Sequence, residues 1–149
     1  MLIILAAAVA LLSEAFELVA HVIHLRGVRI DRAPAGQKPT LILPLTGAAG
    51  GFERLIDCLN RQTQPFRRLI VAVESTGDPA HDRVQDLRAR ARFEIDLVIA
   101  GIGDTRGQKC TNIIAAVKSL APEDRIVVFI DGDILPQDWW LATQITPLA

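Results

Sequence analysis

The stretch VVFIDGDIL, residues 127–135, places two acidic residues directly after an apolar run. An unbroken apolar run is typical of a strand buried on both faces of a parallel sheet, so we expect a central strand here. Asp131 and Asp133 then stand at its carboxyl end, where the loops of an α/β fold surround a ligand. A divalent cation, Mg²⁺ or Mn²⁺, would relieve the repulsion between the two carboxylates. The stretch therefore predicts a metal site, with a solvated Asp-Gly turn as the alternative.

Strand and helix patterns alternate upstream of this stretch. We expect strands at residues 40–45, 67–75, 94–101 and 125–130, and helices at 52–62, 78–91 and 108–120. Strands that alternate with helices pair in parallel through right-handed crossovers. The fold class is therefore predicted to be α/β, with a mostly parallel sheet flanked by helices.

The apolar excess is concentrated in residues 1–25, which contain 20 apolar side chains and five polar ones. Their length suits a transmembrane helix, or a membrane-anchor helix that lies in the interface. Their polar side chains are Ser13, Glu14, Glu17, His21 and His24, of which the last four share one helix face. Residues 26–40 form a linker rich in Pro, Gly and basic residues, and Arg26, Arg29, Arg32 and Lys38 place the following domain, 41–149, in the cytoplasm.

The charge balance argues against a nucleic-acid partner. The formal net charge of −1 over 149 residues leaves no basic field across a whole face. Cys58 and Cys110 fall in no metal-ligand or redox spacing, which favours free thiols in a reducing compartment, with a single disulfide as the alternative.

Other families also end a strand on such acids. A haloacid-dehalogenase-like phosphatase carries Asp-x-Asp there but needs a longer chain downstream. A dinucleotide-dependent oxidoreductase would use Gly101, Gly103 and Gly107 after one strand, and Asp131 after the next as the ribose-binding acid. The glycine spacing matches that fingerprint weakly, and a P-loop is excluded because Gln108 separates the glycine from the lysine.

A third pattern accounts for more of the chain. Four segments carry this pattern by their order and spacing along the chain. They are LILPLTG (41–47), LIDCLNRQTQPFRRLIVAVES (55–75), RGQKCTNIIAAV (106–117) and VVFIDGDILPQDWW (127–140). From residue 41 onward the chain resembles the N-terminal half of a glycosyltransferase family 2 domain, with features of its ceramide glucosyltransferase-like branch. The resemblance implies a GT-A-type, Rossmann-like fold and a nucleotide-diphosphate sugar as donor.

The resemblance also implies roles for particular residues. Asp131 and Asp133 match the metal-binding Asp-x-Asp, and Asp131 also contacts the nucleotide sugar. Lys109 and Asn112 match positions that line the donor pocket, although Lys109 also suits the exposed first turn of a helix. Glu74 or Asp78 takes the place of an acid that contacts the nucleobase and ribose, and Glu74 is equally a plain strand-end carboxylate.

The family's catalytic base lies well beyond its Asp-x-Asp, so the base is expected beyond Ala149 and the chain is expected to be a fragment. We therefore expect a membrane-associated glycosyltransferase that faces the cytoplasm and transfers a sugar to a lipid or glycan acceptor. The alternatives are a nucleotide-binding remnant without activity, a dinucleotide-dependent oxidoreductase domain and a non-enzymatic membrane adaptor.

Overall fold

The computed structural model describes residue 36 and residues 38–146. The predicted membrane segment, 1–25, and most of the predicted linker lie outside the described residues. Among the residues that are described, no helix has the length and apolar character needed to cross a membrane.

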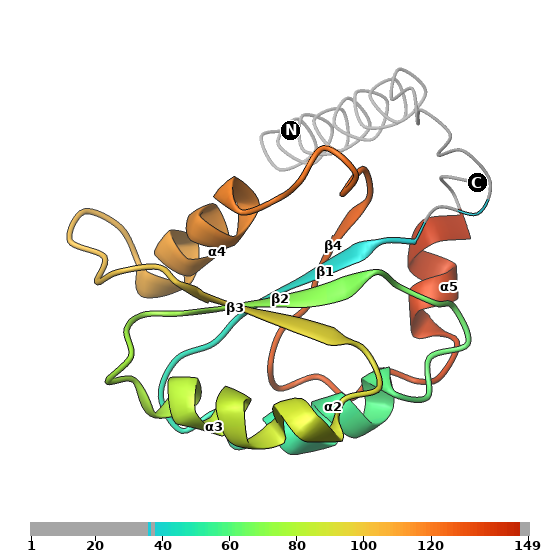
Figure 1. Ribbon diagram of the computed structural model, residues 1–149, viewed down its shortest axis with the longest axis horizontal. Coiled ribbons are helices and arrows are strands. Elements are labelled where there is room, and N and C mark those ends of the chain that lie inside the picture. The colour runs from blue at the N-terminus through green and yellow to red at the C-terminus, as the bar shows by residue number, and fades with distance from the viewer. Residues whose placement is uncertain (1–35, 37, 147–149) are drawn as a thin grey trace, which may run out of the picture. The chain divides into compact units, whose positions relative to one another are not determined.

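Four strands form one parallel sheet at the centre of the domain (Figure 1). They are β1 (Thr40–Pro44), β2 (Arg68–Val73), β3 (Glu94–Ile99) and β4 (Val127–Phe129), in the order β3-β2-β1-β4. β1 lies in the interior because it pairs on one side with β2, Leu41 opposite Leu69, and on the other with β4, Leu41 opposite Val128. The predicted α/β class and the parallel pairing are confirmed.

The prediction that the strand before Asp131 lies at the centre of the sheet is wrong. β4 is only three residues long and stands at the edge of the described sheet, beside β1 alone. Its last residue, Phe129, remains 53% exposed. An apolar run indicates that side chains tend to be buried but does not distinguish an interior strand from an edge strand. Here β1 and β2 are the interior strands.

Helices cover both faces of the sheet (Figure 1). The helices are α2 (Phe52–Leu59), α3 (Pro79–Leu87) with the 3₁₀ turn η1 (Arg88–Arg90), α4 (Gln108–Lys118) and α5 (Trp140–Ile145). α2 and α3 lie on one face and α4 on the other. The larger core lies on the α2 and α3 side, where Leu41, Phe52 and Val71 are fully buried. The smaller core under α4 contains Ile42, Ile70, Ala72 and Ala116.

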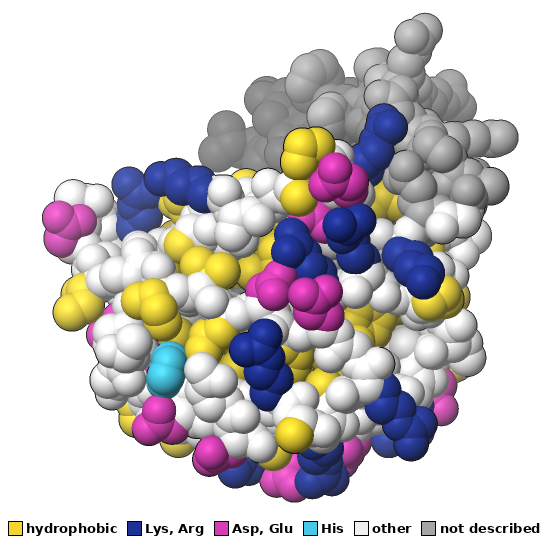
Figure 2. Space-filling view, viewed as in Figure 1, with side chains coloured by type: hydrophobic (Ala, Val, Ile, Leu, Met, Phe, Trp, Pro, Cys, Tyr) yellow, Lys and Arg dark blue, Asp and Glu magenta, His cyan; other side chains and the backbone are white. Residues whose placement is uncertain are grey.

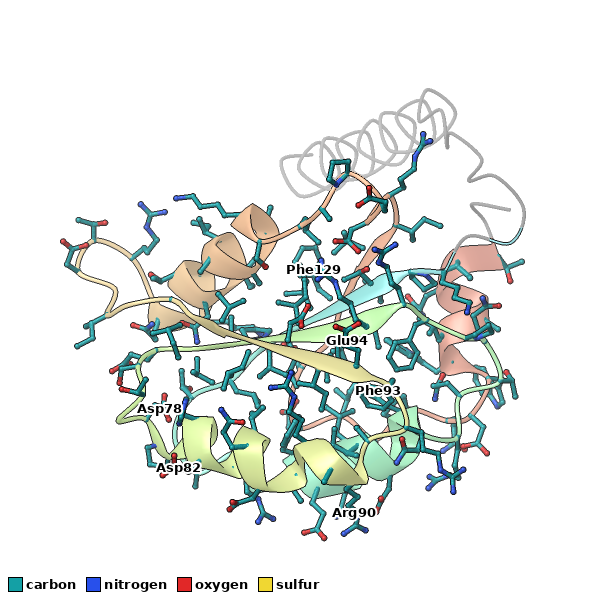
Figure 3. The ribbon with its side chains drawn as sticks, viewed as in Figure 1. Asp78, Asp82, Arg90, Phe93, Glu94 and Phe129 are labelled. Carbon is teal, nitrogen blue, oxygen red and sulfur yellow. The ribbon has the colours of Figure 1, made fainter. Side chains whose placement is uncertain are left out.

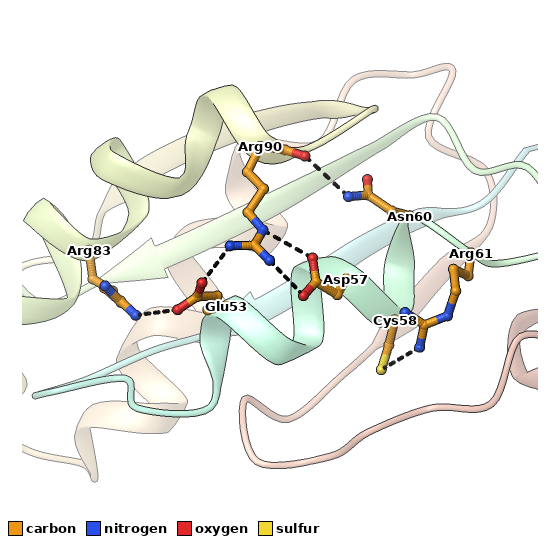
Figure 4. A network of polar contacts seen from close by, with 7 residues as sticks. All are labelled: Glu53, Asp57, Cys58, Asn60, Arg61, Arg83 and Arg90. Atoms are coloured by element: carbon orange, nitrogen blue, oxygen red, sulfur yellow. Dashed lines mark hydrogen bonds and ion pairs between the residues drawn. The ribbon is translucent and has the colours of Figure 1, made fainter.

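Ion pairs tie the helices of the larger core together (Figure 4). The guanidinium of Arg90 donates to both oxygens of Asp57, at 3.0 and 2.9 Å, and to Glu53 at 2.5 Å. Arg83 on α3 donates to the other oxygen of Glu53 at 3.0 Å. Since these side chains are more than a third exposed, the pairs align α2 with α3 and add little to the free energy of unfolding.

A more buried network lies at the amino ends of the strands. Asp124, whose side chain is fully buried, accepts hydrogen bonds from Thr40 at 2.5 Å, from the Ala121 backbone N–H at 2.8 Å and from Arg68. Burial alone would raise the pKa of Asp124, but these three donors outweigh it and hold that pKa below its ordinary value. Arg68 also donates to Asp96 on β3 at 2.5 Å, so the network links β1, β2 and β3.

Candidate functional site

A cleft of about 600 Å³ opens at the carboxyl ends of β1 and β4. It is lined by Pro44, Leu45, Thr46, Ala49, Gly50, Gly51, Arg54, Lys109, Asn112, Asp131, Gly132 and Asp133. The chain runs from β1 to β2 and β3 on one side and then returns to place β4 on the other side of β1. The cleft therefore lies where the strand order reverses, which is the usual ligand position in open parallel sheets.

The floor of the cleft is formed by two loops in close contact. A Cβ atom on Gly51, at the start of α2, would lie 2.7 Å from the carbonyl oxygen of Gly132, which is too close for any side chain. The β1–α2 loop is further held by Asp78, whose Oδ1 accepts from the Gly47 N–H at 2.8 Å. Gly47 has a φ of 66°, a conformation that glycine adopts without strain. The loop that carries Asp131 and Asp133 is thus packed directly against the start of α2.

Asp131 and Asp133 both line the cleft, but their surroundings differ. Asp131 Oδ1 lies 2.6 Å from Nζ of Lys109, an ion pair in which both side chains are more than half exposed. Asp133 makes no ion pair or side-chain hydrogen bond within the described residues. The hydrogen bond to Asp131 and then the charge of that carboxylate raise the pKa of Lys109, so the ammonium form is favoured.

These residues fit the metal that the sequence predicts. Within the described part of the chain, no group of three or more His, Cys, Asp or Glu side chains is placed to hold a metal ion. Mg²⁺ commonly takes only one or two protein carboxylates and completes its shell with water and substrate phosphates. Asp131 and Asp133 supply two such carboxylates in one cleft, and the ammonium of Lys109 pairs with Asp131.

Asn112 lines the cleft, yet its amide is committed to the backbone. Its side chain is fully buried, and Nδ2 donates to the carbonyl oxygens of Leu45 at 2.9 Å and Ala72 at 3.1 Å. Its Oδ1 accepts from the side chain of Gln108 at 2.8 Å. Asn112 therefore joins the ends of β1 and β2 to α4, which holds Lys109 in place over the cleft.

The two acids considered for nucleobase and ribose contact do not line the cleft. Glu74 follows β2 and is half-buried, and its backbone carbonyl accepts from the Gly101 N–H at 2.9 Å. Asp78 is buried at the amino end of α3, where Oδ1 also accepts from the Ala80 N–H at 2.8 Å (Figure 3). Asp78 thus caps α3 and holds the β1–α2 loop, so it affects the cleft only through the position of that loop.

Sequence reasoning missed Arg54, which lines the cleft from α2. Arg54 is exposed and makes no ion pair within residues 38–146. Together with Lys109 it gives the cleft two cations beside two carboxylates. The signal was present in GGFER, residues 50–54, because side chains in the first turn of a helix point back toward its N-terminus, which here follows the carboxyl end of β1.

Charge over the rest of the surface is mixed. On the face in Figure 2, acidic and basic side chains are interspersed. This agrees with the formal net charge of −1.

The sheet order does not favour the dinucleotide alternative. That alternative needs the glycine turn and Asp131 to follow neighbouring parallel strands. In the structure the turn follows β3 and Asp131 follows β4, and these strands stand at opposite edges of the described sheet. The backbone groups of the turn are also already paired with the Gln108 side chain, which accepts from the Gly103 N–H at 2.7 Å and donates to the Gly101 carbonyl at 2.8 Å.

Comparison with known proteins adds no family assignment, because neither a family model nor a curated protein sequence matches the chain. The resemblance to glycosyltransferase family 2 therefore stays a prediction that depends on the residues described above.

Proposed function

We propose that the domain is the donor-binding half of a membrane-associated glycosyltransferase. In this proposal the cleft binds a nucleotide-diphosphate sugar together with Mg²⁺ or Mn²⁺. The observation that carries it is the meeting of Asp131, Asp133 and Lys109 in one cleft at the point where the strand order reverses. The GT-A-type fold and the lipid or glycan acceptor belong to the same proposal.

The charges in the cleft suit a metal-bound diphosphate. Asp131 and Asp133 would hold the cation, which when bound stabilises the negative charge on the departing nucleoside diphosphate. The cations Lys109 and Arg54 would pair with phosphate oxygens, Lys109 as a point charge and Arg54 as a planar fork. Two cations and two carboxylates sum to zero, so the cleft would attract the neutralised complex more than either free ion.

The backbone around the cleft is preorganised for such a ligand. Asn112 fixes the ends of β1 and β2, while Asp78 fixes the loop before α2. Because these contacts are made within the protein itself and do not depend on a ligand atom, little ordering entropy is lost on binding. The proposal for residues 41–149 concerns donor binding, because the cleft residues described here suit the metal and the diphosphate of the donor.

Isothermal titration calorimetry of the 149-residue chain in mild detergent tests the proposal. UDP or GDP should bind with Mn²⁺ present and weaken at least about tenfold in chelator, because the uncompensated carboxylates then repel the phosphates. NAD(H) is the comparison ligand. NAD(H) binding that is tight and indifferent to chelator would overturn the proposal in favour of an oxidoreductase.

A further inference from the structure

We propose that Lys109 is a placeholder for the metal ion, and that its release from Asp131 couples metal binding to diphosphate binding. This inference rests on the proposed function. It starts from the 2.6 Å ion pair between Lys109 Nζ and Asp131 Oδ1, set against an Asp133 that makes no such pair within the described residues. The cleft thus holds one neutralised carboxylate and one free one.

A cation that arrives alone meets a site that is half occupied. It must displace the ammonium from Asp131 and then remain close to a displaced positive charge. A unit charge and a divalent ion repel each other at close range even in water, and salt weakens this repulsion. Metal alone should therefore bind on the order of three to ten times more weakly than it would if position 109 carried no charge.

A diphosphate that arrives with the metal changes this balance. Once the metal takes Asp131, the ammonium of Lys109 can pair with a phosphate oxygen in the same cleft. Both side chains of the pair are more than half exposed, so the exchange needs no unfolding of α4. Each ligand then strengthens the other by the same factor, as linkage requires.

The position of Lys109 suits a side chain that moves from Asp131 to a phosphate, and not a fixed structural contact. It stands in the first turn of α4, which the buried amide of Asn112 anchors one helical turn later. The backbone position of Lys109 is therefore fixed while its side chain is free to reach either partner. Exposed ion pairs contribute little to stability, so the fold does not depend on this one.

The test compares Lys109→Met with Lys109→Arg and with the control Lys118→Met, which removes the same charge from the far end of α4. Mn²⁺ affinity is measured on the 149-residue chain by electron paramagnetic resonance of free Mn²⁺, without nucleotide. GDP affinity is then measured by calorimetry in saturating Mn²⁺. Mn²⁺ bound elsewhere on the chain is common to all variants.

Lys109→Met should bind Mn²⁺ alone about three- to tenfold more tightly than wild type and bind GDP with Mn²⁺ about three- to tenfold more weakly. Lys109→Arg and Lys118→Met should stay within about twofold of wild type in the Mn²⁺ measurement. If Lys109→Met binds Mn²⁺ no more tightly while wild type still binds GDP with Mn²⁺, the placeholder role is overturned and the proposed function stands. If wild type binds no nucleoside diphosphate, the proposed function itself fails.

Discussion

Replacement of Asn112 by alanine should destabilise the domain by about 2–4 kcal/mol. The Asn112 side chain is fully buried and donates to the carbonyl oxygens of Leu45 and Ala72. The Ala72 oxygen keeps a second donor, the Leu45 N–H at 2.9 Å, but the Leu45 oxygen loses its side-chain donor. A buried carbonyl left without a donor costs about 1–3 kcal/mol, and the second lost bond with a small cavity adds about 1 kcal/mol.

Urea unfolding of the 149-residue chain in mild detergent measures the change in the free energy of unfolding. The m-value, which is the slope of that free energy against urea concentration, should be the same for both proteins. Thr111→Val is the matched control on the same helix, because the Thr111 hydroxyl is buried and has no hydrogen-bond partner among the residues that the structure describes. Removal of that hydroxyl should leave the stability within about 1 kcal/mol of wild type or raise it. If Asn112→Ala keeps wild-type stability but loses nucleotide binding, Asn112 is a ligand contact and the structural reasoning is refuted.

Three other predictions concern acid stability, the floor of the cleft and the membrane segment. Contacts in the folded protein lower the pKa of Asp124, so they stabilise the fold fully above the pKa of Asp124 in the unfolded chain, about 3.9. This stabilisation is lost as the pH falls through the pKa of Asp124 in the folded protein. The stability advantage of wild type over Asp124→Asn in urea melts should therefore shrink below about pH 4. Gly51→Ala should cost about 1–3 kcal/mol because its Cβ meets a backbone oxygen at 2.7 Å, whereas Gly50→Ala, with open space at its Cβ, should be nearly neutral in the same assay. Residues 1–25 should hold the chain in membranes with residues 41–149 cut by protease in inverted vesicles, and protection of the domain there would contradict the predicted orientation.

The sequence predicted the alternation of elements well because each pattern is local. The strand before residue 74 and the helix from residue 108 follow from their apolar periods, and parallel pairing follows from the alternation. The edge position of β4 could not be predicted, because which strands become neighbours depends on how the whole chain packs. The observed order places β1, not β4, between two partners.

The site was predictable in part for the same reason. Asp131 and Asp133 are recognisable because two acids follow one strand, and that position fixes them at the ligand edge of the sheet. The partner of Asp131 depends on where α4 begins relative to β4, which no local pattern encodes. The commitment of Asn112 and Asp78 to backbone groups is likewise visible only after folding, because their bonds reach residues far away in sequence.

Thermal melts of wild type and Asp133→Asn, each with GDP in chelator and in excess Mn²⁺, test the central claim most directly. A ligand that binds only the folded state raises the midpoint, so wild type should melt higher with Mn²⁺ than with chelator. Asn keeps the shape of Asp and one acceptor oxygen but lacks the charge, so the variant should show no such rise and should be equally or more stable than wild type in chelator. If Mn²⁺ shifts neither protein and the variant is strongly destabilised in chelator, the acidic pair is a structural turn and the donor-binding account is wrong.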